Sequence, residues 1–406
     1  MLSQDLIDWL RLALLLEVGS RRGKVLLERF KTPKAVLEAS LDDIAEVENI
    51  GRETAKKIVE GREKIDFCRQ IELLEKNNVS IIPLDSEFYP VSLKSIFDPP
   101  LVLFVQGEIL PQDYFSIGIV GTRMSSFYGR TMAEKLSRQL VERGFTVVSG
   151  GARGVDTFSH QSALKANGRT IGILGCGLDI TYPPENKNLF KKIVEKGAMV
   201  SEFPLGTPPN RQNFPMRNRI ISGLSLGTLV IEAPLKSGAL ITVTHAIEQG
   251  REVFSVPGQA DSFVSKGTNQ LLREGAKLVE DADDIIEELE PVLNSKIKEF
   301  KTAVNQSMQR DKSLSSSDLI GGSTEQPIFL DSPDKSGNDL GISVQLSEQE
   351  AQVYNLFFDD PLEFDDIIIK SRLPVNVVSS MLTTLQLKKL VKQLPGKVFE
   401  KEELKS

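Results

Sequence analysis

The pattern of apolar and polar positions divides the chain into four parts. Residues 1–75 have the periodicity of short amphipathic helices, and residues 76–290 alternate short apolar runs with amphipathic helices from about residue 114 onward. Residues 291–345 are polar, rich in Ser and Gly and without periodicity, which is typical of a flexible linker. Residues 346–406 contain three amphipathic segments followed by a hairpin pattern. We therefore expect a helical domain, an α/β domain with its core at 114–290, a linker and a small C-terminal domain.

The alternating region predicts the fold class. Its apolar runs are short and nearly continuous in apolar character, which is typical of strands buried on both faces of a sheet. Between the first two runs, one stripe of a predicted helix carries Ala133, Leu136, Leu140 and Val141. Strands that alternate so regularly with helices indicate a parallel sheet with helices on both faces. We predict an α/β fold with a Rossmann-like, doubly wound and mostly parallel sheet.

The N-terminal region predicts a helix-hairpin-helix domain. Residues 14–30 and 44–61 each carry apolar residues, a Gly with a polar turn, and then a basic helix. Gly51 would allow a sharp turn and expose N–H groups at the next helix start, which suits non-specific binding of DNA phosphates. A helical packing module is the alternative, because three glutamates crowd the second hairpin.

The C-terminal region predicts a winged-helix domain, since three helices are closed by a small β-hairpin. In such domains the third helix enters a groove of the DNA. Here that helix has few basic residues before Lys388 and Lys389. A protein-contact or structural role therefore fits this domain as well as DNA binding does.

The distribution of charge along the chain indicates the kind of ligand. The chain carries 56 Asp and Glu against 49 Lys and Arg, a net charge of −7, which argues against wholesale coating of nucleic acid. Yet no Asp or Glu occurs in residues 114–133, 157–178 or 203–231, where Gly-rich or Arg-rich loops lie. A surface that holds a polyanion excludes carboxylates and offers Arg, Lys and free backbone N–H groups. The sequence predicts a local phosphate-binding surface, which a screening length of about 8–10 Å separates from the acidic faces.

Other classes of site are disfavoured. Cys68 and Cys176 supply no disulfide framework and fit a reducing cytoplasm, and no apolar run approaches the roughly 20 residues of a membrane span. His160 and His245 stand alone on predicted helices, without the spacing of a metal site. No GxGxxG or Walker motif occurs, so a cofactor for hydride transfer is disfavoured. We expect a cytoplasmic protein that needs neither a metal nor a cofactor.

Two loops that follow predicted strands are the first candidates for the site. Ligands of an open α/β sheet bind beyond the carboxyl ends of its strands, where Thr122 and Arg123 follow the first strand. Residues 149–156, SGGARGVD, follow the second strand and open a helix. Their glycines allow close backbone approach, and their N–H groups can donate to a phosphate. Each loop by itself fits a tight turn equally well.

Further candidates follow the later strands. Lys187 stands in the first turn of a predicted helix, which is unfavourable for the helix dipole unless an anion compensates; a solvated surface lysine is the alternative. Arg217 and Arg219 flank Asn218 and diverge by roughly 160° on a helix. We expect one to reach the crevice and the other to anchor the fold through carbonyls or a buried carboxylate. Glu232 is the one carboxylate placed for catalysis, and no His or second acid accompanies it in sequence.

The ordered motifs between about residues 119 and 279 resemble those of the DprA/Smf family (DNA-processing protein A). They are IVGTR, SGGARGVD, GCGLDITYP, FPMRNRIISGLS, EAPLKSGALIT, REVFSVPG and GTNQLLREGAKLV. The flanking regions resemble more loosely the sterile-alpha-motif-like and winged-helix domains of that family. The resemblance implies a bacterial cytoplasmic protein that binds and protects single-stranded DNA and helps load the RecA recombinase onto it, in natural transformation and recombination.

The resemblance also implies which residues contact DNA and which form the dimer interface. By motif position, the family's DNA contacts fall on Gly121, Thr122, Arg123, Ser149, Gly150, Gly151, Arg153, Gly154, Lys187, Phe190, Arg217, Asn218 and Arg219. Phe190 would stack on a base, and the absence of base-reading clusters fits sequence-independent binding. Family members form homodimers around the positions of Leu272 and Leu278, and the helix 239–250 lies near the surface implicated in RecA contact. No residue needs a catalytic role.

The competing hypothesis is an enzyme on a similar sheet. Nucleotide phosphoribohydrolases of the LOG (LONELY GUY) type cradle a nucleotide phosphate in glycine loops and use a Gly-Gly-x-Gly-Thr turn followed by a catalytic acid. The corresponding place here, residues 232–242, reads EAPLKSGALIT and lacks that turn. A purely structural or partner-binding scaffold is the third hypothesis, and it leaves the acid-free segments unexplained.

Overall fold

The computed structural model describes residues 3–15 and 19–294 of the larger part of the chain. In the C-terminal part it describes residues 352–357, 361–371, 378, 381–382, 385–386, 390–394 and 398–401. The chain divides into two compact units, Met1–Asp318 and Leu319–Ser406, and each is described by itself. Residues 282–294 form one helix that crosses the boundary expected at 290, and the rest of the expected linker lies outside the described residues.

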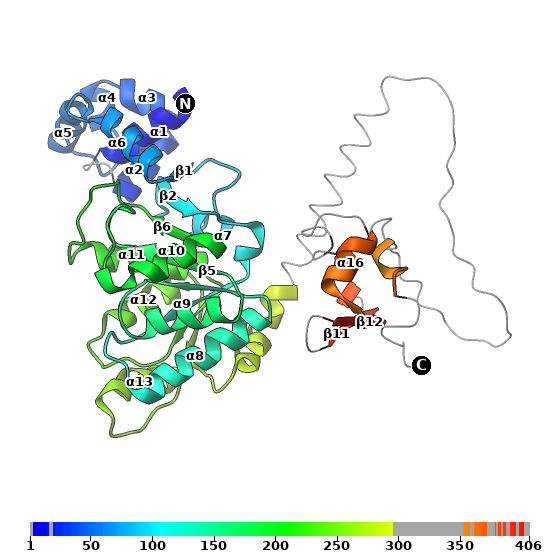
Figure 1. The fold of residues 1–406 in the computed structure, drawn as a ribbon. Coiled ribbons are helices and arrows are strands. Elements are labelled where there is room, and N and C mark those ends of the chain that lie inside the picture. The colour runs from blue at the N-terminus through cyan, green and yellow to red at the C-terminus, as the bar shows by residue number, and fades with distance from the viewer. Residues whose placement is uncertain are drawn as a thin grey trace, which may run out of the picture. The chain divides into compact units, whose positions relative to one another are not determined.

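The N-terminal domain is helical and lies at one end of the larger unit (Figure 1). Its helices are α1 Gln4–Leu14, α2 Gly19–Phe30, α3 Pro33–Glu38, α4 Leu41–Ala45, α5 Arg52–Arg62 and α6 Phe67–Lys76. Ser3, Thr32, Ser40 and Asp66 each accept a backbone N–H at a helix start, which is the preference of these residue types. Asn49 takes a left-handed φ of 64° in the turn before α5, so the chain reverses between α4 and α5 as a hairpin requires.

A single sheet forms the centre of the larger unit, with the strand order β1-β2-β6-β5-β4-β3-β7-β8-β9. The strands are β1 Ser80–Pro83, β2 Val102–Gly107, β3 Ser116–Val120, β4 Thr146–Ser149, β5 Thr170–Leu174, β6 Ala198–Ser201, β7 Gly227–Val230, β8 Glu252–Ser255 and β9 Lys277–Leu278. From β6 to β9 in that order all neighbours are parallel, while β2 pairs antiparallel with both β1 and β6. The predicted Rossmann-like, mostly parallel sheet is confirmed.

Helices cover both faces of this sheet (Figure 1). They are α7 Val91–Lys94, α8 Phe127–Glu142, α9 Val155–Lys165, α10 Lys187–Lys196, α11 Asn213–Leu224, α12 Gly238–Glu248 and α13 Lys266–Arg273, with the 3-10 turns η1 Pro111–Tyr114, η2 Pro184–Asn186 and η3 Phe263–Ser265. Ile117 and Ile119 of β3 pack with Leu136 of α8, whereas Val120 packs with Ile221 of α11. All residues of β3 to β7 are buried, which explains their nearly continuous apolar character.

The sheet reverses its direction of growth at β3. From β3 the chain adds β4, β5 and β6 on one side, and it then returns to add β7, β8 and β9 on the other side. Crevices form beyond the carboxyl ends of the strands at such a switch point, because the two neighbouring connections leave in opposite directions. The fold therefore brings the loops after β3, β4, β5 and β7 to one edge of the sheet.

The C-terminal unit has the features of the predicted winged helix. Its described elements are α16 Phe364–Ser371 and an antiparallel sheet in the order β10-β12-β11, made of β10 Leu362–Glu363, β11 Val391–Leu394 and β12 Val398–Lys401. Phe357, Ile367, Leu385 and Phe399 contribute to its own buried core. Lys388 and Lys389, the basic pair of the predicted third helix, lie outside the described residues.

Candidate nucleic-acid interface

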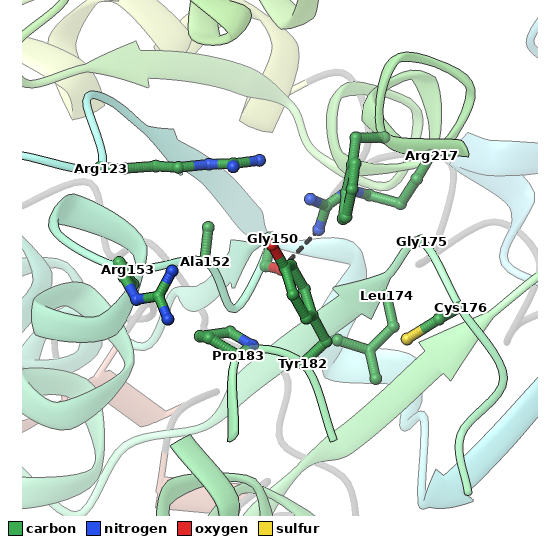
Figure 2. Close-up of a pocket in the computed structure, with 11 residues that line it drawn as sticks. Arg123, Gly150, Ala152, Arg153, Leu174, Gly175, Cys176, Tyr182, Pro183 and Arg217 are labelled. Carbon is green, nitrogen blue, oxygen red and sulfur yellow. Dashed lines mark hydrogen bonds between the residues drawn. The ribbon is translucent and has the colours of Figure 1, made fainter. Parts of the chain in front are cut away.

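A small pocket lies beyond the carboxyl ends of β3, β4 and β5. It is lined by Arg123, Gly150, Ala152, Arg153, Leu174, Gly175, Cys176, Tyr182, Pro183, Phe214 and Arg217. Figure 2 shows the side chains of Arg123 and Arg217 reaching toward it from opposite sides of the view. The structure thus brings together the loops that the sequence singled out after the first and second strands of the core.

The loop after β3 presents an unpaired guanidinium. The N–H of Thr122 donates to the carbonyl of Glu232 at 2.8 Å, which fixes the loop against the end of β7. Arg123 is exposed, and its guanidinium carbon lies 5.4 Å from the centroid of the Phe214 ring. No ion pair of Arg123 occurs within the described part of the chain. Its charge is held over an aromatic face and remains available to an anion.

The glycine loop after β4 needs its glycines for close packing. A Cβ on Gly154 would overlap the backbone of Thr122 and Arg123, and Gly154 itself has a left-handed φ of 74°. A Cβ on Gly150 would overlap the guanidinium of Arg217. The two candidate loops are therefore in direct contact, and they form one surface.

A buried carboxylate supports the glycine loop from below. Asp156, in the first turn of α9, accepts the N–H of Ala152 at 3.2 Å. Burial raises the pKa of Asp156, while the charge of Arg217 and the hydrogen bond from Ala152 act in the opposite direction. Ser149 lies beneath the same loop, where its hydroxyl donates to the carbonyl of Ile119 at 2.6 Å. These contacts fix the loop rather than face a ligand.

The charge of Arg153 is not free. Its guanidinium pairs with Glu185 through two hydrogen bonds, and both side chains are about half exposed. Glu185 lies in η2 before α10, so the pair joins the glycine loop to the loop after β5. A phosphate at Arg153 would have to compete with this carboxylate, whereas a phosphate at Arg123 would not.

Arg217 and Arg219 take different positions, as the sequence predicts. Arg217 lines the pocket, but it is only 4% exposed and donates to the carbonyls of Gly150 (2.5 Å) and Ile173. Burial lowers the pKa of the Arg217 guanidinium to about 10. Arg217 therefore spans the ends of β4 and β5 from beneath the pocket.

Arg219 does not line the pocket, which corrects its inclusion among the DNA contacts. Its guanidinium pairs with Glu202 at 2.6 Å, donates to the carbonyl of Asp98 at 3.1 Å and reaches Ser20 of α2 at 2.9 Å. It joins the helical domain, the segment before β2 and the end of β6, so it anchors the fold. Asn218 likewise donates to the carbonyl of Gly238, at 3.2 Å, and does not line the pocket.

Lys187 and Phe190 begin α10 beside the pocket. Lys187 is exposed, and no ion pair or hydrogen bond of its side chain occurs within the described residues. Phe190 is only 7% exposed and packs against Gly151. The structure thus gives Phe190 a packing role in place of an open stacking face, because the protein covers the ring, and stacking on Phe190 would require the ring to move.

Two features of the site were not expected from the sequence. Asn186 does not cap α10 with its side chain, but donates to the carbonyl of Gly151 at 3.0 Å and to Thr157 at 2.8 Å. Tyr182 and Phe214 form an aromatic wall with ring centroids 5.7 Å apart. The only sequence signal for this wall was the position of both rings beside prolines in the TYPP and NFP motifs.

Glu232 is engaged by the protein at the switch point. The side chain is 2% exposed, and it accepts the N–H of Ser126 at 2.9 Å and the hydroxyl of Ser126 at 2.6 Å. A Cβ on Gly129 would overlap the Glu232 carboxylate. The carboxylate therefore occupies the N-terminal end of α8, where a Rossmann fold that binds a nucleotide holds its phosphate.

The expected dimer residues lie at the opposite side of the switch point from β4. Leu272 is half-buried on α13, and Leu278 of the edge strand β9 is 45% exposed.

Among the described residues, no group of three or more His, Cys, Asp and Glu side chains is arranged to hold a metal ion. None of the helices in the described ranges is long and apolar enough to cross a membrane.

Family models match three regions of the chain. The model for DNA recombination-mediator protein A matches residues 80–290, which include the whole pocket. The DprA winged helix domain matches residues 342–397, and a SAM-like helix-hairpin-helix tandem matches residues 11–64. The matches follow one another in the order of the domains predicted from the sequence.

Individual relatives agree with these models. Protein Smf of Synechocystis sp. is 33% identical over 400 residues, which cover 97% of this chain and 98% of the relative. The X-ray structure of DNA processing protein A from Streptococcus pneumoniae is 33% identical, covers 69% of this chain and 97% of that chain, and has a TM-score of 0.60. A structure from Helicobacter pylori, which describes a single-stranded DNA binding mode, is 30% identical over 52% of this chain, with a TM-score of 0.47.

Proposed function

Because the chain belongs to the DNA recombination-mediator protein A (DprA/Smf) family, we propose that its pocket binds the backbone of single-stranded DNA without reading sequence. The observation that carries the proposal is the pair of exposed cations without an ion pair among the described residues, Arg123 in the pocket lining and Lys187 at the start of α10. Backbone phosphates provide evenly spaced negative charges for such cations. We place the contacts on Arg123, Lys187, the glycine loop and, after displacement of Glu185, Arg153.

A binding role is better supported than a catalytic one. Catalysis on a nucleotide needs a carboxylate or another polar group that faces the ligand. Glu232 is buried against Ser126, and Asp156 is buried beneath the glycine loop. We therefore propose that the protein is not an enzyme, against the alternative of a nucleotide phosphoribohydrolase.

The family and the pocket together support a wider role. We propose that the protein protects single-stranded DNA and loads the RecA recombinase onto it in the cytoplasm, during DNA uptake and recombination. We also propose a homodimer through the surface of Leu272 and Leu278, with α12 near the surface that meets RecA. A dimer would place two pockets on one strand and raise the apparent affinity for long DNA.

Charge reversal at the pocket tests the binding proposal. Arg123→Glu and Lys187→Glu should each weaken binding of a labelled dT oligonucleotide by about 10-fold or more, because each removes a phosphate contact and adds a repelling charge. Fluorescence anisotropy over a salt series measures both the affinity and the salt slope. The slope should fall by about 0.7 for each single-strand phosphate that the variant no longer neutralises.

Lys165→Glu provides a matched control. Lys165 is an exposed lysine at the far end of α9, on the opposite edge of the sheet, and its reversal changes the net charge by the same amount. It should leave the affinity nearly unchanged. Equal reductions in affinity for all three variants would mean that net charge rather than the pocket binds DNA. If the wild-type protein does not bind dT and instead binds or cleaves AMP, the result would favour the hypothesis of a nucleotide phosphoribohydrolase.

A further inference from the structure

Large apolar side chains are exposed on the loops next to the pocket. Phe127 at the start of α8 is 85% exposed, Met124 in the loop before it is 84% exposed, and Phe263 in η3 is 74% exposed. Leu235, in the loop after β7, is 57% exposed. We call these four side chains the apolar rim. The rim follows β3, β7 and β8, whereas the pocket follows β3, β4 and β5, so the two surfaces share the loop of Arg123.

The loops that carry the rim are tied to one another. The loops after β3 and β7 are joined by the contacts of Glu232 described above. The Tyr128 hydroxyl donates to the carbonyl of Pro257 at 2.8 Å, which joins α8 to the loop after β8. The N–H of Gly267 donates to the carbonyl of Ala233 at 2.7 Å, which joins α13 to the loop after β7. The rim is therefore part of one continuous edge of the sheet.

Phe127 is held exposed by its own helix start. Ser126 caps α8 by accepting the N–H of Gly129 at 3.1 Å, and the same serine is fixed by Glu232. Phe127 follows this cap as the first residue of the helix. A phenyl ring on a fixed backbone loses little conformational freedom when a flat ligand covers it. Such a ring is suited to stacking, and it faces solvent, unlike the covered ring of Phe190.

Cations are interleaved with the rim. Arg123 precedes Met124, Lys236 follows Leu235, and Lys266 begins α13 three residues after Phe263. Lys236 and Lys266 are exposed, and neither forms an ion pair within the ranges that the structure describes. Asp261 is an exposed carboxylate two residues before Phe263, so Phe127 is in the more favourable position for a polyanion. Apolar faces that alternate with cations are the arrangement used for single strands, whose bases stack while their phosphates pair.

We propose that Phe127 stacks on a base of the bound single strand and that Phe263 supports a second base. On this proposal the DNA path leaves the pocket at Arg123 and crosses the ends of β7 and β8 toward Lys266. The inference rests on the proposed binding of single-stranded DNA, and it adds a second binding segment with its own residues. A base presents an aromatic face whatever its identity, so the added contact keeps binding independent of sequence.

An oligonucleotide without bases separates stacking from phosphate binding. Wild-type protein should prefer dT over an abasic strand of equal length, because only dT can stack. Phe127→Ala should weaken dT binding by about 5- to 100-fold, the usual effect of removing one base–aromatic stack, and should leave abasic binding unchanged. Phe263→Ala should do the same to a smaller extent. Fluorescence anisotropy on both strands gives the two affinities for each variant.

Phe88→Ala is the matched control, since Phe88 is 73% exposed but belongs to the segment between β1 and α7. It should bind both strands as the wild type does. If Phe127→Ala binds dT with the same affinity as wild type and Phe88→Ala, the stacking proposal is wrong. The DNA-binding proposal then still stands, because dT is bound. If wild type does not bind dT at all, both proposals fail. Circular dichroism checks that each variant is folded.

A tryptophan at position 127 reports contact directly. The native Trp9 is 3% exposed, so a base cannot reach it, and Phe127→Trp adds an exposed indole. Saturating dT should quench the new fluorescence, and the abasic strand should quench it much less. Binding of dT without quenching would overturn the proposal. If Phe127→Ala changes the molar mass of the protein and leaves the dT affinity unchanged, the rim is a protein contact. That result would also overturn the stacking proposal.

Discussion

Several glycines around the pocket are required by neighbouring side chains rather than by their own backbone angles. A Cβ on Gly121 would lie 2.5 Å from a methyl carbon of Val155, and one on Gly129 would overlap the carboxylate of Glu232. Neither glycine has a positive φ. At these two positions the space is taken by residues that are distant in sequence. The sequence motif pointed to the loop that follows Gly121, while the reason for each of these glycines came from the packing.

Gly129→Ala should destabilise the protein by about 1–3 kcal/mol, because the methyl group and the Glu232 carboxylate cannot occupy the same space. In an exposed helix the same change usually stabilises. Urea unfolding, followed by circular dichroism, measures the difference. Gly238→Ala is the control, since Gly238 begins α12 and a Cβ there would meet nothing within 4 Å. A Gly129→Ala variant as stable as Gly238→Ala would mean that Glu232 moves freely.

The cations of the site show what one residue type can do in different surroundings. Arg123 lies over the ring of Phe214 and pairs with no carboxylate of the described residues. Arg153 forms an ion pair with Glu185, and Arg217 is buried and donates to backbone carbonyls. Sequence placed all three near the site, because each belongs to a motif that follows a strand. The sequence did not show which of the three guanidinium groups is available to a ligand, because their partners come from other loops of the same edge.

At the scale of elements, α9 is tied to the sheet through a buried histidine. His160 Nδ1 lies 2.7 Å from the hydroxyl oxygen of Thr170 in β5, and the ring is 0% exposed. Burial lowers the pKa of His160 to about 3, and the charge of Arg217 acts in the same direction. His160, which stands alone on its predicted helix, is thus a packed residue of the core.

This histidine predicts an acid-sensitive stability. The folded state keeps His160 neutral, while the unfolded state protonates it below a pKa of about 6.5, so stability is lost as the pH falls from about 6.5 toward 3. At pH 5 the loss should be about 2 kcal/mol relative to pH 7. Urea midpoints of wild type and His160→Gln at both pH values test this. If both proteins lose the same stability between pH 7 and pH 5, His160 is not responsible.

The start of α8 is the element that most distinguishes this fold from a nucleotide-binding one. In a nucleotide-binding Rossmann fold, the first helix after the first strand offers its N-terminal N–H groups to a phosphate. Here Glu232 takes that place, held by both polar groups of Ser126. The anion-binding surface that we propose therefore lies on the next two loops, where the glycine loop and Lys187 lie.

At the scale of the whole molecule, an acidic chain places the exposed cations Arg123, Lys187, Lys236 and Lys266 after strands that end at one edge of the sheet. The switch point between β3 and β7 brings together segments that lie up to about a hundred residues apart in sequence. Two carboxylates of that edge are paired or buried, since Glu185 pairs with Arg153 and Glu232 is 2% exposed. A net charge of −7 is therefore compatible with a surface that attracts a polyanion.

Assembly gives a prediction at this scale. Leu272→Arg should convert the proposed dimer to monomers, because a charge in an apolar interface has no partner there. Light scattering measures the mass, and anisotropy measures the affinity for oligonucleotides of two lengths. Affinity for a strand that fills one pocket should be unchanged, whereas affinity for a strand that reaches two pockets should fall by about 100-fold or more.

Ile247→Arg controls for the added charge, since Ile247 is 64% exposed on α12 and is not among the residues of the proposed dimer surface. It should keep the mass and both affinities. A Leu272→Arg variant that stays dimeric would exclude Leu272 from the interface. Monomers that bind the long strand as tightly as the wild type would show that two pockets do not act together.

The sequence by itself determined the fold class, the loops at the site and their charge. Periodicity, strand length and the absence of carboxylates are local properties, so the α/β sheet, the loop of Arg123, the glycine loop and the first turn of α10 followed from them. Tertiary structure decided which of these groups are free. It covered Phe190 and exposed Phe127, and it turned Arg219 toward Glu202, Asp98 and Ser20, because burial and pairing depend on segments that meet only when the sheet is assembled.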